Sequence, residues 1–183
     1  MAVVACLMTL AGCNSDEVPP SASPTGTSLS SSSESATPTS TPSRSLTPDQ
    51  QDLRSAEDAI AEYWWVLDGA ASNPNQSLNI LATVARSQAL AQWQTTLTTD
   101  RAQGLTQKGL STVRDVEASS KDGKTFTVSA CLDVSAVDVV DASGKSMVRS
   151  DRPALQNYTY MVQKAPEGFF VIQDLLKGQP CAG

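Results

Sequence analysis

Residues 123–135, GKTFTVSACLDVS, alternate between apolar and polar side chains, and this alternation decides the fold class. One face carries Phe126, Val128, Ala130, Leu132 and Val134. The other face carries Thr127, Ser129, Cys131 and Asp133. A period of two residues predicts a β-strand with one buried face. Asp122-Gly123 is a hairpin turn signal, so we expect this strand to pair with a preceding strand over residues 110–118.

The sequence after this strand continues an antiparallel sheet. Residues 156–176, QNYTYMVQKAPEGFFVIQDLL, predict two strands that are joined by a turn at residues 166–168. Residues 142–145 predict the tip of another hairpin. We therefore expect the strand through Cys131 to run long and to bend near Ser135.

The first half of the chain has a helical period. Thr47, Pro48 and Gln50 form a capping-box start, and apolar residues then recur every three or four positions as far as Leu67. A short helix is expected over residues 78–84, and a longer one carries Leu90, Trp93 and Leu97. Helices followed by strands predict an α+β fold, with the helices packed on one face of an antiparallel sheet of about four strands.

Composition limits the number of domains and the function classes. The chain has 183 residues, of which 40% are hydrophobic, which predicts one folded domain over residues 47–183 and some unstructured sequence. A net charge of -6 argues against nucleic acid as a partner. The chain contains no histidine, so it lacks the side chain that most often acts as general base or metal ligand near neutral pH.

The N-terminus predicts export and a membrane anchor. Residues 1–12 form an apolar segment too short to span a bilayer but suited to a signal peptide, although no Lys or Arg precedes it. Leu10-Ala11-Gly12-Cys13 resembles the bacterial lipobox, which implies that Cys13 is diacylated and becomes the mature N-terminus. Residues 13–46 then form a Ser/Thr/Pro-rich tether that is expected to be disordered. We expect an attachment to the lipid bilayer at the outer face of the cell membrane.

The order of elements and the lipoprotein start resemble a known fold family. Residues 47–181 resemble the nuclear transport factor 2-like or cystatin-like superfamily, in which a curved antiparallel sheet wraps a long helix. The whole chain also resembles uncharacterised lipoproteins of high-GC Gram-positive bacteria that carry such a domain. In the enzymatic branches, Asp, Tyr and His residues line the space between helix and sheet, and this chain has no His.

The cysteines predict one disulfide bond. The lipobox resemblance implies that Cys6 is removed with the signal peptide and that Cys13 is lipidated, which would leave Cys131 and Cys181 as the remaining thiols in an oxidising compartment. We expect them to pair and to hold the C-terminal tail against the outer face of the sheet. The alternative, a reactive or metal-binding pair, lacks both a CxxC spacing and a histidine.

Two groups of residues are candidates for chemistry. Four aspartates surround the central hairpin, and a solvated acidic hairpin is favoured over a calcium site because the spacing matches no EF-hand loop; these are Asp133, Asp138, Asp141 and Asp151. Five aromatic residues are expected on helix and sheet faces that could meet: Tyr63, Trp64, Trp93, Tyr158 and Tyr160. They form either part of the core or the lining of a pocket. Tyr63, Trp64 and Trp65 cannot all face inward from one helix.

Three function classes remain open. The first, which we favour, is a binding or interaction module for a small ligand or an envelope protein, without a cofactor and without catalysis. The second is a small enzyme that uses Asp and Tyr residues in a pocket between helix and sheet. The third is a structural protein of envelope assembly. An open pocket between the Trp64 helix and the sheet would favour the first two, whereas a filled core would exclude them.

Overall fold

The computed structural model describes residues 45–179 and 181, and these begin with a long helix. Helix α1 (Pro48–Ser72) starts with the predicted capping box. The Gln50 backbone N–H donates to Thr47 Oγ1 over 3.3 Å, and the Thr47 N–H donates to Gln50 Oε1 over 3.0 Å. The helix ends where the Asn73 N–H donates to the Gly69 carbonyl. Both ends follow from local hydrogen bonding.

The predicted stripe of α1 is its buried face. Ala56, Ile60 and Tyr63 are fully buried, and Trp64 is nearly so. Trp65 instead exposes 69% of its surface. One of the three consecutive aromatic residues therefore faces outward, as the helical period requires.

Two further helical segments connect α1 to the sheet. Residues expected to form a short helix make a 3-10 helix, η1 (Leu78–Thr83), and α2 (Ser87–Ala102) is the predicted longer helix. Between them, Val84 accepts a backbone hydrogen bond from Val171, and the Val171 carbonyl accepts one from Arg86. These bonds attach the start of α2 to the last strand of the sheet.

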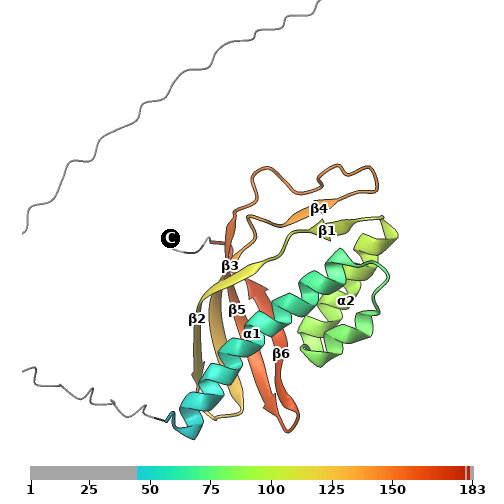
Figure 1. The fold of residues 1–183 in the computed structure, drawn as a ribbon. Coiled ribbons are helices and arrows are strands. Elements are labelled where there is room, and N and C mark those ends of the chain that lie inside the picture. The colour runs from blue at the N-terminus through green and yellow to red at the C-terminus, as the bar shows by residue number, and fades with distance from the viewer. Residues whose placement is uncertain (1–44, 180, 182–183) are drawn as a thin grey trace, which may run out of the picture. The chain divides into compact units, whose positions relative to one another are not determined.

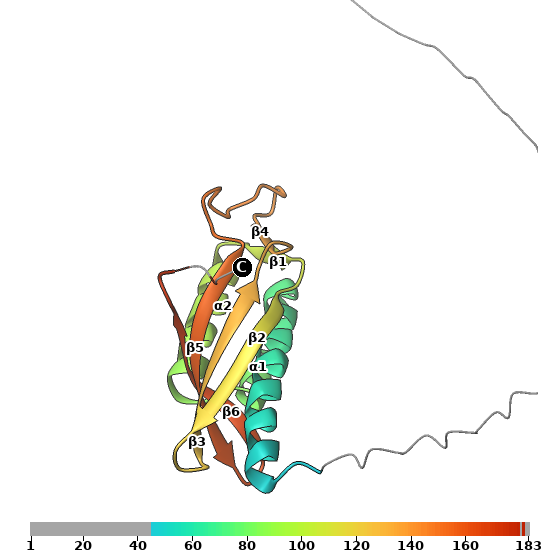
Figure 2. The same ribbon diagram turned by 90° about the vertical axis from the view of Figure 1, so that its left-hand side faces the viewer.

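Four antiparallel strands form the main sheet, in the order β2-β3-β5-β6. The strands are β2 (Thr112–Ser120), β3 (Thr125–Asp133), β5 (Leu155–Ala165) and β6 (Gly168–Leu176). Helices α1 and α2 lie on one face of this sheet, and Figure 2 shows the other face free of helices. The α+β prediction with about four strands is confirmed.

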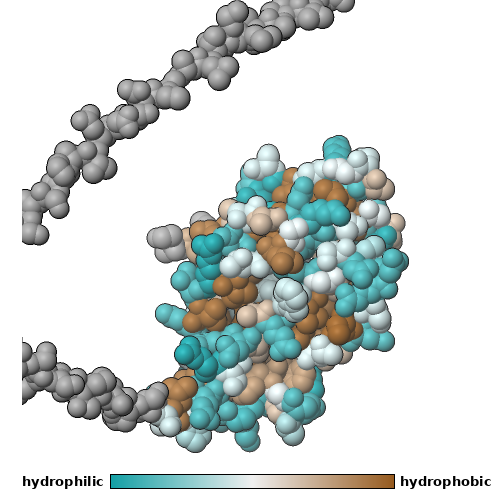
Figure 3. Space-filling view, in the orientation of Figure 1, coloured by the Kyte–Doolittle hydropathy of each residue, from teal (hydrophilic) through white to brown (hydrophobic). Residues whose placement is uncertain are grey.

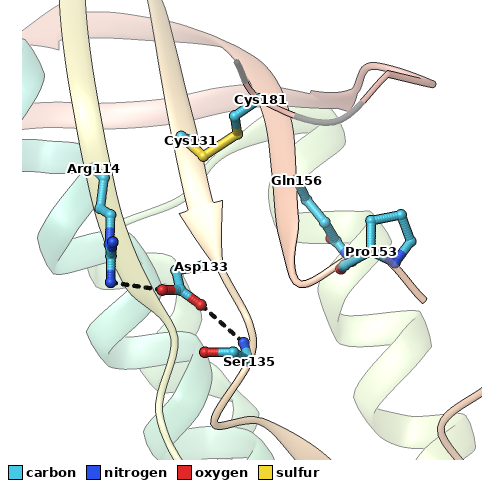
Figure 4. The surroundings of a disulfide bond; sticks show 7 residues. All are labelled: Arg114, Cys131, Asp133, Ser135, Pro153, Gln156 and Cys181. Atoms are coloured by element: carbon cyan, nitrogen blue, oxygen red, sulfur yellow. Dashed lines mark hydrogen bonds and ion pairs between the residues drawn. A yellow bond between two sulfur atoms is a disulfide. The ribbon is translucent and has the colours of Figure 1, made fainter. Parts of the chain in front are cut away.

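Cys131 faces away from the helices and forms the predicted disulfide with Cys181. The two Cα atoms are 5.8 Å apart. The bond joins β3 to the residues after β6 on the outer side of the sheet, beside the ion pair between Arg114 and Asp133 (Figure 4). It closes a loop of 50 residues, for which chain entropy predicts roughly 4 kcal/mol of stabilisation.

A second, two-stranded sheet lies at one end of the domain and was not expected. Strands β1 (Thr106–Lys108) and β4 (Asp138–Val140) pair antiparallel. The strand through Cys131 therefore does not run long: β3 ends at Asp133, and a turn closed by the Val137 N–H and the Val134 carbonyl leads into β4. The predicted hairpin tip is present as a turn at residues 141–145.

The surface gives no separate indication of function. The face in Figure 3 carries several hydrophobic patches separated by hydrophilic residues. Scattered exposed apolar residues are normal on a soluble domain surface. None of the helices within residues 45–179 is long and apolar enough to cross a membrane. Cys13, the signal peptide over residues 1–12 and most of the tether lie outside the described residues.

Candidate functional site

A cavity of about 270 Å³ lies between α1, α2 and the inner face of β3 and β5, below strands β1 and β4. Small side chains on the last turns of α1, Ala70 and Ala71, leave room there. Six aliphatic side chains form a further part of the wall: Leu97, Leu105, Leu132, Val134, Val137 and Val139. The size is near the lower end of about 300–1,000 Å³ for ligand pockets, so it suits a compact group.

Three of the predicted aromatic residues line this cavity. The Trp64 ring meets the rings of Trp93 and Tyr158 edge to face, with both centroid distances 5.6 Å. The N–H group of each indole donates a hydrogen bond to a buried side chain. Trp64 Nε1 donates to the Tyr160 hydroxyl over 2.7 Å, and Trp93 Nε1 donates to Asp174 Oδ2 over 2.7 Å. The aromatic wall is therefore fixed before any ligand arrives.

Tyr63 and Tyr160 do not line the cavity, although both were candidates for that role. Both side chains are fully buried. Tyr63 donates its hydroxyl hydrogen bond to Asp174 over 2.7 Å, and Tyr160 stacks against Tyr158 at 5.6 Å. Tyr158 and Tyr160 point to the same side of β5, but Tyr160 lies two residues farther along the strand, below α1. These two residues support the wall from behind.

Burial raises the pKa of all three tyrosines. Tyr158 is affected least, and its pKa rises to about 12 through burial and the nearby Asp174 carboxylate. The pKa values of Tyr63 and Tyr160 are raised further, again mainly through burial. All three hydroxyls are therefore neutral at physiological pH and can donate hydrogen bonds.

Several polar residues of the lining are occupied in holding the backbone. Arg101 donates to the carbonyls of Ala70, Asn73 and Gln76 at the end of α1, over 2.8–3.1 Å. Arg152 donates through Nη2 to the carbonyls of Val134 and Val137. Arg101 thereby fixes the end of α1 and the turn that follows it, and Arg152 fixes the loop after β3 that lines the cavity.

Asp68 holds a further part of the wall. Its buried carboxylate accepts hydrogen bonds from the Gln107 amide over 2.6 Å and from the Ser111 hydroxyl and backbone N–H over 3.0 and 2.7 Å. Gln107 and Ser111 both line the cavity. The sequence contained a signal for this residue, since Asp68 follows Trp64 by four positions and so places a carboxylate on the buried face of α1.

Four polar side chains of the lining remain available to a ligand. Asp100 and Thr106 make no side-chain hydrogen bond among the described residues. The other two make only long hydrogen bonds: the Tyr158 hydroxyl donates to Gln156 Oε1 over 3.5 Å, and Gln156 Nε2 donates to the Pro153 carbonyl over 3.4 Å. Burial raises the pKa of Asp100 above the ordinary aspartate value. The cavity thus combines an aromatic and aliphatic wall with a small number of free polar groups.

The four aspartates near the central hairpin are not gathered into one site. Asp133 pairs with Arg114, Asp151 pairs with Arg149, and Asp141 accepts hydrogen bonds within its own turn. Among the described residues, no three His, Cys, Asp or Glu side chains lie close enough together to hold a metal ion. Asp100 and Arg152, which the cavity does contain, were not singled out because neither belongs to a recognisable spacing.

The α+β fold, with a long helix packed against a four-stranded antiparallel sheet, is shared with two solved structures. The intermembrane-space region of the chloroplast protein ARC6 is 18% identical with a TM-score of 0.51, covering 68% of this chain and 95% of that one. A Novosphingobium aromaticivorans protein described as an aromatic ring hydroxylase is 12% identical with a TM-score of 0.51, covering 69% and 87%.

These similarities concern the fold alone, because sequence identity is low. No protein-family model matches the chain, and no curated protein matches its sequence. Function therefore has to be argued from the cavity itself.

Proposed function

We propose that this chain is a lipid-anchored lipoprotein whose α+β domain binds a small, mostly apolar molecule in the cavity behind Trp64, Trp93 and Tyr158. The observation that carries the proposal is the cavity itself, a preformed space with a fixed aromatic wall and free polar groups. Preformed apolar pockets with a few polar groups are typical of ligand sites.

Binding is favoured over catalysis because the chain lacks histidine and because, among the described residues, the one hydroxyl of the lining that donates to a carboxylate, that of Ser111, donates to Asp68, which also accepts from the Gln107 amide and the Ser111 N–H and so holds the wall. No cofactor is part of the proposal. A binding site needs shape and a few fixed polar groups, which the lining supplies. The bound molecule is a small ligand; an envelope protein that receives it is the other partner we consider.

Titration with 2-naphthol, a compact neutral probe, tests the site. Ala71→Leu adds volume inside the cavity, whereas Ala61→Leu adds the same volume on the exposed side of the same helix. We expect Ala71→Leu to weaken binding by about tenfold or more, since overpacking costs about 1–3 kcal/mol, and Ala61→Leu to leave it unchanged. No calorimetric binding to the wild type, or equal affinities in the two variants, would contradict the proposal.

The anchor rests on the lipobox resemblance at Cys13 and is tested separately. Mass spectrometry of protein extracted from the membranes of a bacterium with lipoprotein processing should find Cys13 as the N-terminus with two acyl chains. Cys13→Ser should move the protein to the soluble fraction. An unmodified Met1 in the soluble fraction of wild-type cells would overturn the anchor and leave the cavity argument intact.

An enzyme that uses Asp and Tyr side chains is the second candidate, because burial raises the pKa of Asp100 at the cavity wall. General acid–base catalysis works best with a pKa near the operating pH. Carboxyl NMR titration of the wild type, with Asp100→Asn for assignment, measures this value. A pKa near 7 would favour the enzyme, and a value close to that of ordinary aspartate would favour simple binding.

A purely structural role in envelope assembly is the third candidate. It requires no cavity, so naphthol binding would argue against it. Co-purification of a stoichiometric protein partner together with failure of any small probe to bind would favour it.

A further inference from the structure

The cavity continues outward into a groove of about 540 Å³. Five residues line both spaces and form a neck between them: Asp100, Leu105, Val139, Arg152 and Gln156. On the outer side, the groove is bordered by the exposed side chains of Met147 and Leu176. A molecule in the inner cavity that extends toward solvent must therefore pass the polar groups of the neck.

Arg152 is held at this neck with unused hydrogen-bond donors. Its Nη2 donates to the carbonyl of Val134 over 2.9 Å and to that of Val137 over 2.6 Å, which fixes the guanidinium. Its Nε and Nη1 have no partner among the described residues, and neither is a buried atom. A guanidinium stays protonated in proteins, so a fixed positive charge with free N–H groups faces the path of the ligand.

The other charges near the neck do not cancel that of Arg152. Arg149 and Asp151 neutralise each other in the outer groove through a 2.7 Å ion pair. Arg101 is directed at the carbonyls that end α1, where a cation offsets the helix dipole. Asp100 forms no ion pair with Arg152 within the described residues.

We propose that the ligand of this site is a small anionic amphiphile, a compact apolar body that carries a carboxylate or phosphate group. The inference rests on the proposed function and names its ligand class. The apolar body lies against Trp64 and Trp93 in the inner cavity, and the anionic group accepts hydrogen bonds from Nε and Nη1 of Arg152. The Gln156 amide and the Tyr158 hydroxyl, whose own hydrogen bonds of 3.4 and 3.5 Å are long, are further donors in the cavity lining.

Three probes with one naphthalene body and different charge test the ligand class: 2-naphthalenesulfonate, 2-naphthol and 2-naphthylmethylamine. At neutral pH we expect the sulfonate to bind the wild-type domain about tenfold more tightly than the amine, which is the size of one charge-assisted hydrogen bond. The neutral naphthol should fall between them. Added salt should weaken sulfonate binding and leave naphthol binding unchanged.

Arg152→Gln should remove the preference for the sulfonate, so that the sulfonate and the amine bind the variant with similar affinity. Arg149→Gln is the matched control, because this arginine lies in the outer groove and is already paired with Asp151. It should keep the preference. Melting curves of both variants verify that they are folded. If Arg152→Gln does not fold, the salt dependence of sulfonate binding to the wild type tests the anionic ligand class instead.

The possible outcomes separate the two proposals. If naphthol binds but the sulfonate binds no more tightly than the amine, the anionic ligand class is overturned and the binding function stands. The same holds if the sulfonate preference survives Arg152→Gln or is independent of salt. If none of the three probes binds, the proposed binding function itself fails.

Discussion

The two ends of the space between α1 and the sheet are built differently. At the closed end, from the middle of α1 toward its start, Ile60, Phe126 and Val162 are each at most 1% exposed and fill the core, and a separate pocket of about 340 Å³ lies beside Phe126 at the first turns of the helix. At the open end, near the end of α1, Ala70 and Ala71 are too small to fill it, and polar side chains instead hold the surrounding loops in place.

This difference separates stability from function within one fold. Folding removes the apolar side chains of the closed end from water, and this burial contributes most of the stability of the folded domain. At the open end, hydrogen bonds between side chains and backbone hold the loops around the cavity in place. These bonds fix the positions of the loops without filling the cavity with side chains. We therefore expect substitutions at the closed end to lower the free energy of unfolding, and substitutions at the open end to change the cavity at a smaller cost in stability.

Phe126→Ala at the closed end should have the largest effect on stability. Removal of a fully buried aromatic ring costs about 3–5 kcal/mol, through lost transfer free energy and the void that remains. Urea unfolding measures the cost. Naphthol affinity of the folded variant should stay near the wild-type value, and a cost below about 1 kcal/mol would show that this end is not tightly packed.

Gly109→Ala should have the next largest effect and should damage the rim of the open end. Gly109 has a φ of +74°, and an added Cβ would lie 1.8 Å from the Ala136 carbonyl oxygen. We expect a cost of about 3 kcal/mol, because the left-handed conformation costs alanine about 1–2 kcal/mol and displacement of the carbonyl adds an overpacking cost of about 1–3 kcal/mol.

Gly144→Ala is the matched control for this substitution. Gly144 has a φ of +83° with no atom within 4 Å of an added Cβ, so the backbone strain is similar and the clash is absent. Its unfolding free energy should fall by about 1–2 kcal/mol only, with naphthol affinity unchanged. Equal costs at the two glycines would mean that the contact between Gly109 and Ala136 does not shape the rim.

The closed end could be predicted from the sequence because burial follows periodicity. The alternation from Phe126 onward gave the sheet and its inner face, and the helical stripe through Ile60 gave the face of α1 that packs on it. Cys131 and Cys181 could be paired by elimination. The first two of these predictions use residues whose spacing fixes their environment, whereas the disulfide follows from which cysteines remain.

The open end could not be predicted in the same way. Strands β1 and β4 have three residues each, too few to show a period. Arg101 and Arg152 act on backbone carbonyls, which every residue possesses, so no spacing in the sequence indicates their partners. Of the polar residues at this end, only Asp68 carried a signal, through its place on a buried helical face.

Asp68→Ala should show that polar contacts hold the wall of the open end. It removes three hydrogen bonds from Gln107 and Ser111, and we expect a loss of about 1–3 kcal/mol, because donors are left without a partner. Asp58→Ala, at an exposed position on the same helix, should stay within about 0.5 kcal/mol of the wild type. Similar values for the two variants, measured by urea unfolding, would argue against this role of Asp68.

A pH titration of the three tyrosines probes the boundary between the two ends. The tyrosinate absorbance of the folded domain should not change near pH 10. The chain has three tyrosines, and all of them have raised pKa values, with Tyr158 at about 12. The unfolded chain releases these protons near the ordinary pKa of about 10. Because the folded values are raised, stability is fully present below pH 10 and is lost as the pH rises toward 12 and beyond.

The absorbance of tyrosinate and circular dichroism, followed together, distinguish ionisation of the folded domain from unfolding. Tyr158 at the cavity wall should ionise first, since its pKa is raised least, whereas Tyr63 and Tyr160 should ionise only as the domain unfolds. A probe bound in the cavity should delay the first step and leave the second in place. An absorbance step near pH 10 while the circular dichroism signal is unchanged would mean that at least one tyrosine hydroxyl is in contact with water in the folded domain. That result would contradict the burial of the three tyrosines around the aromatic wall.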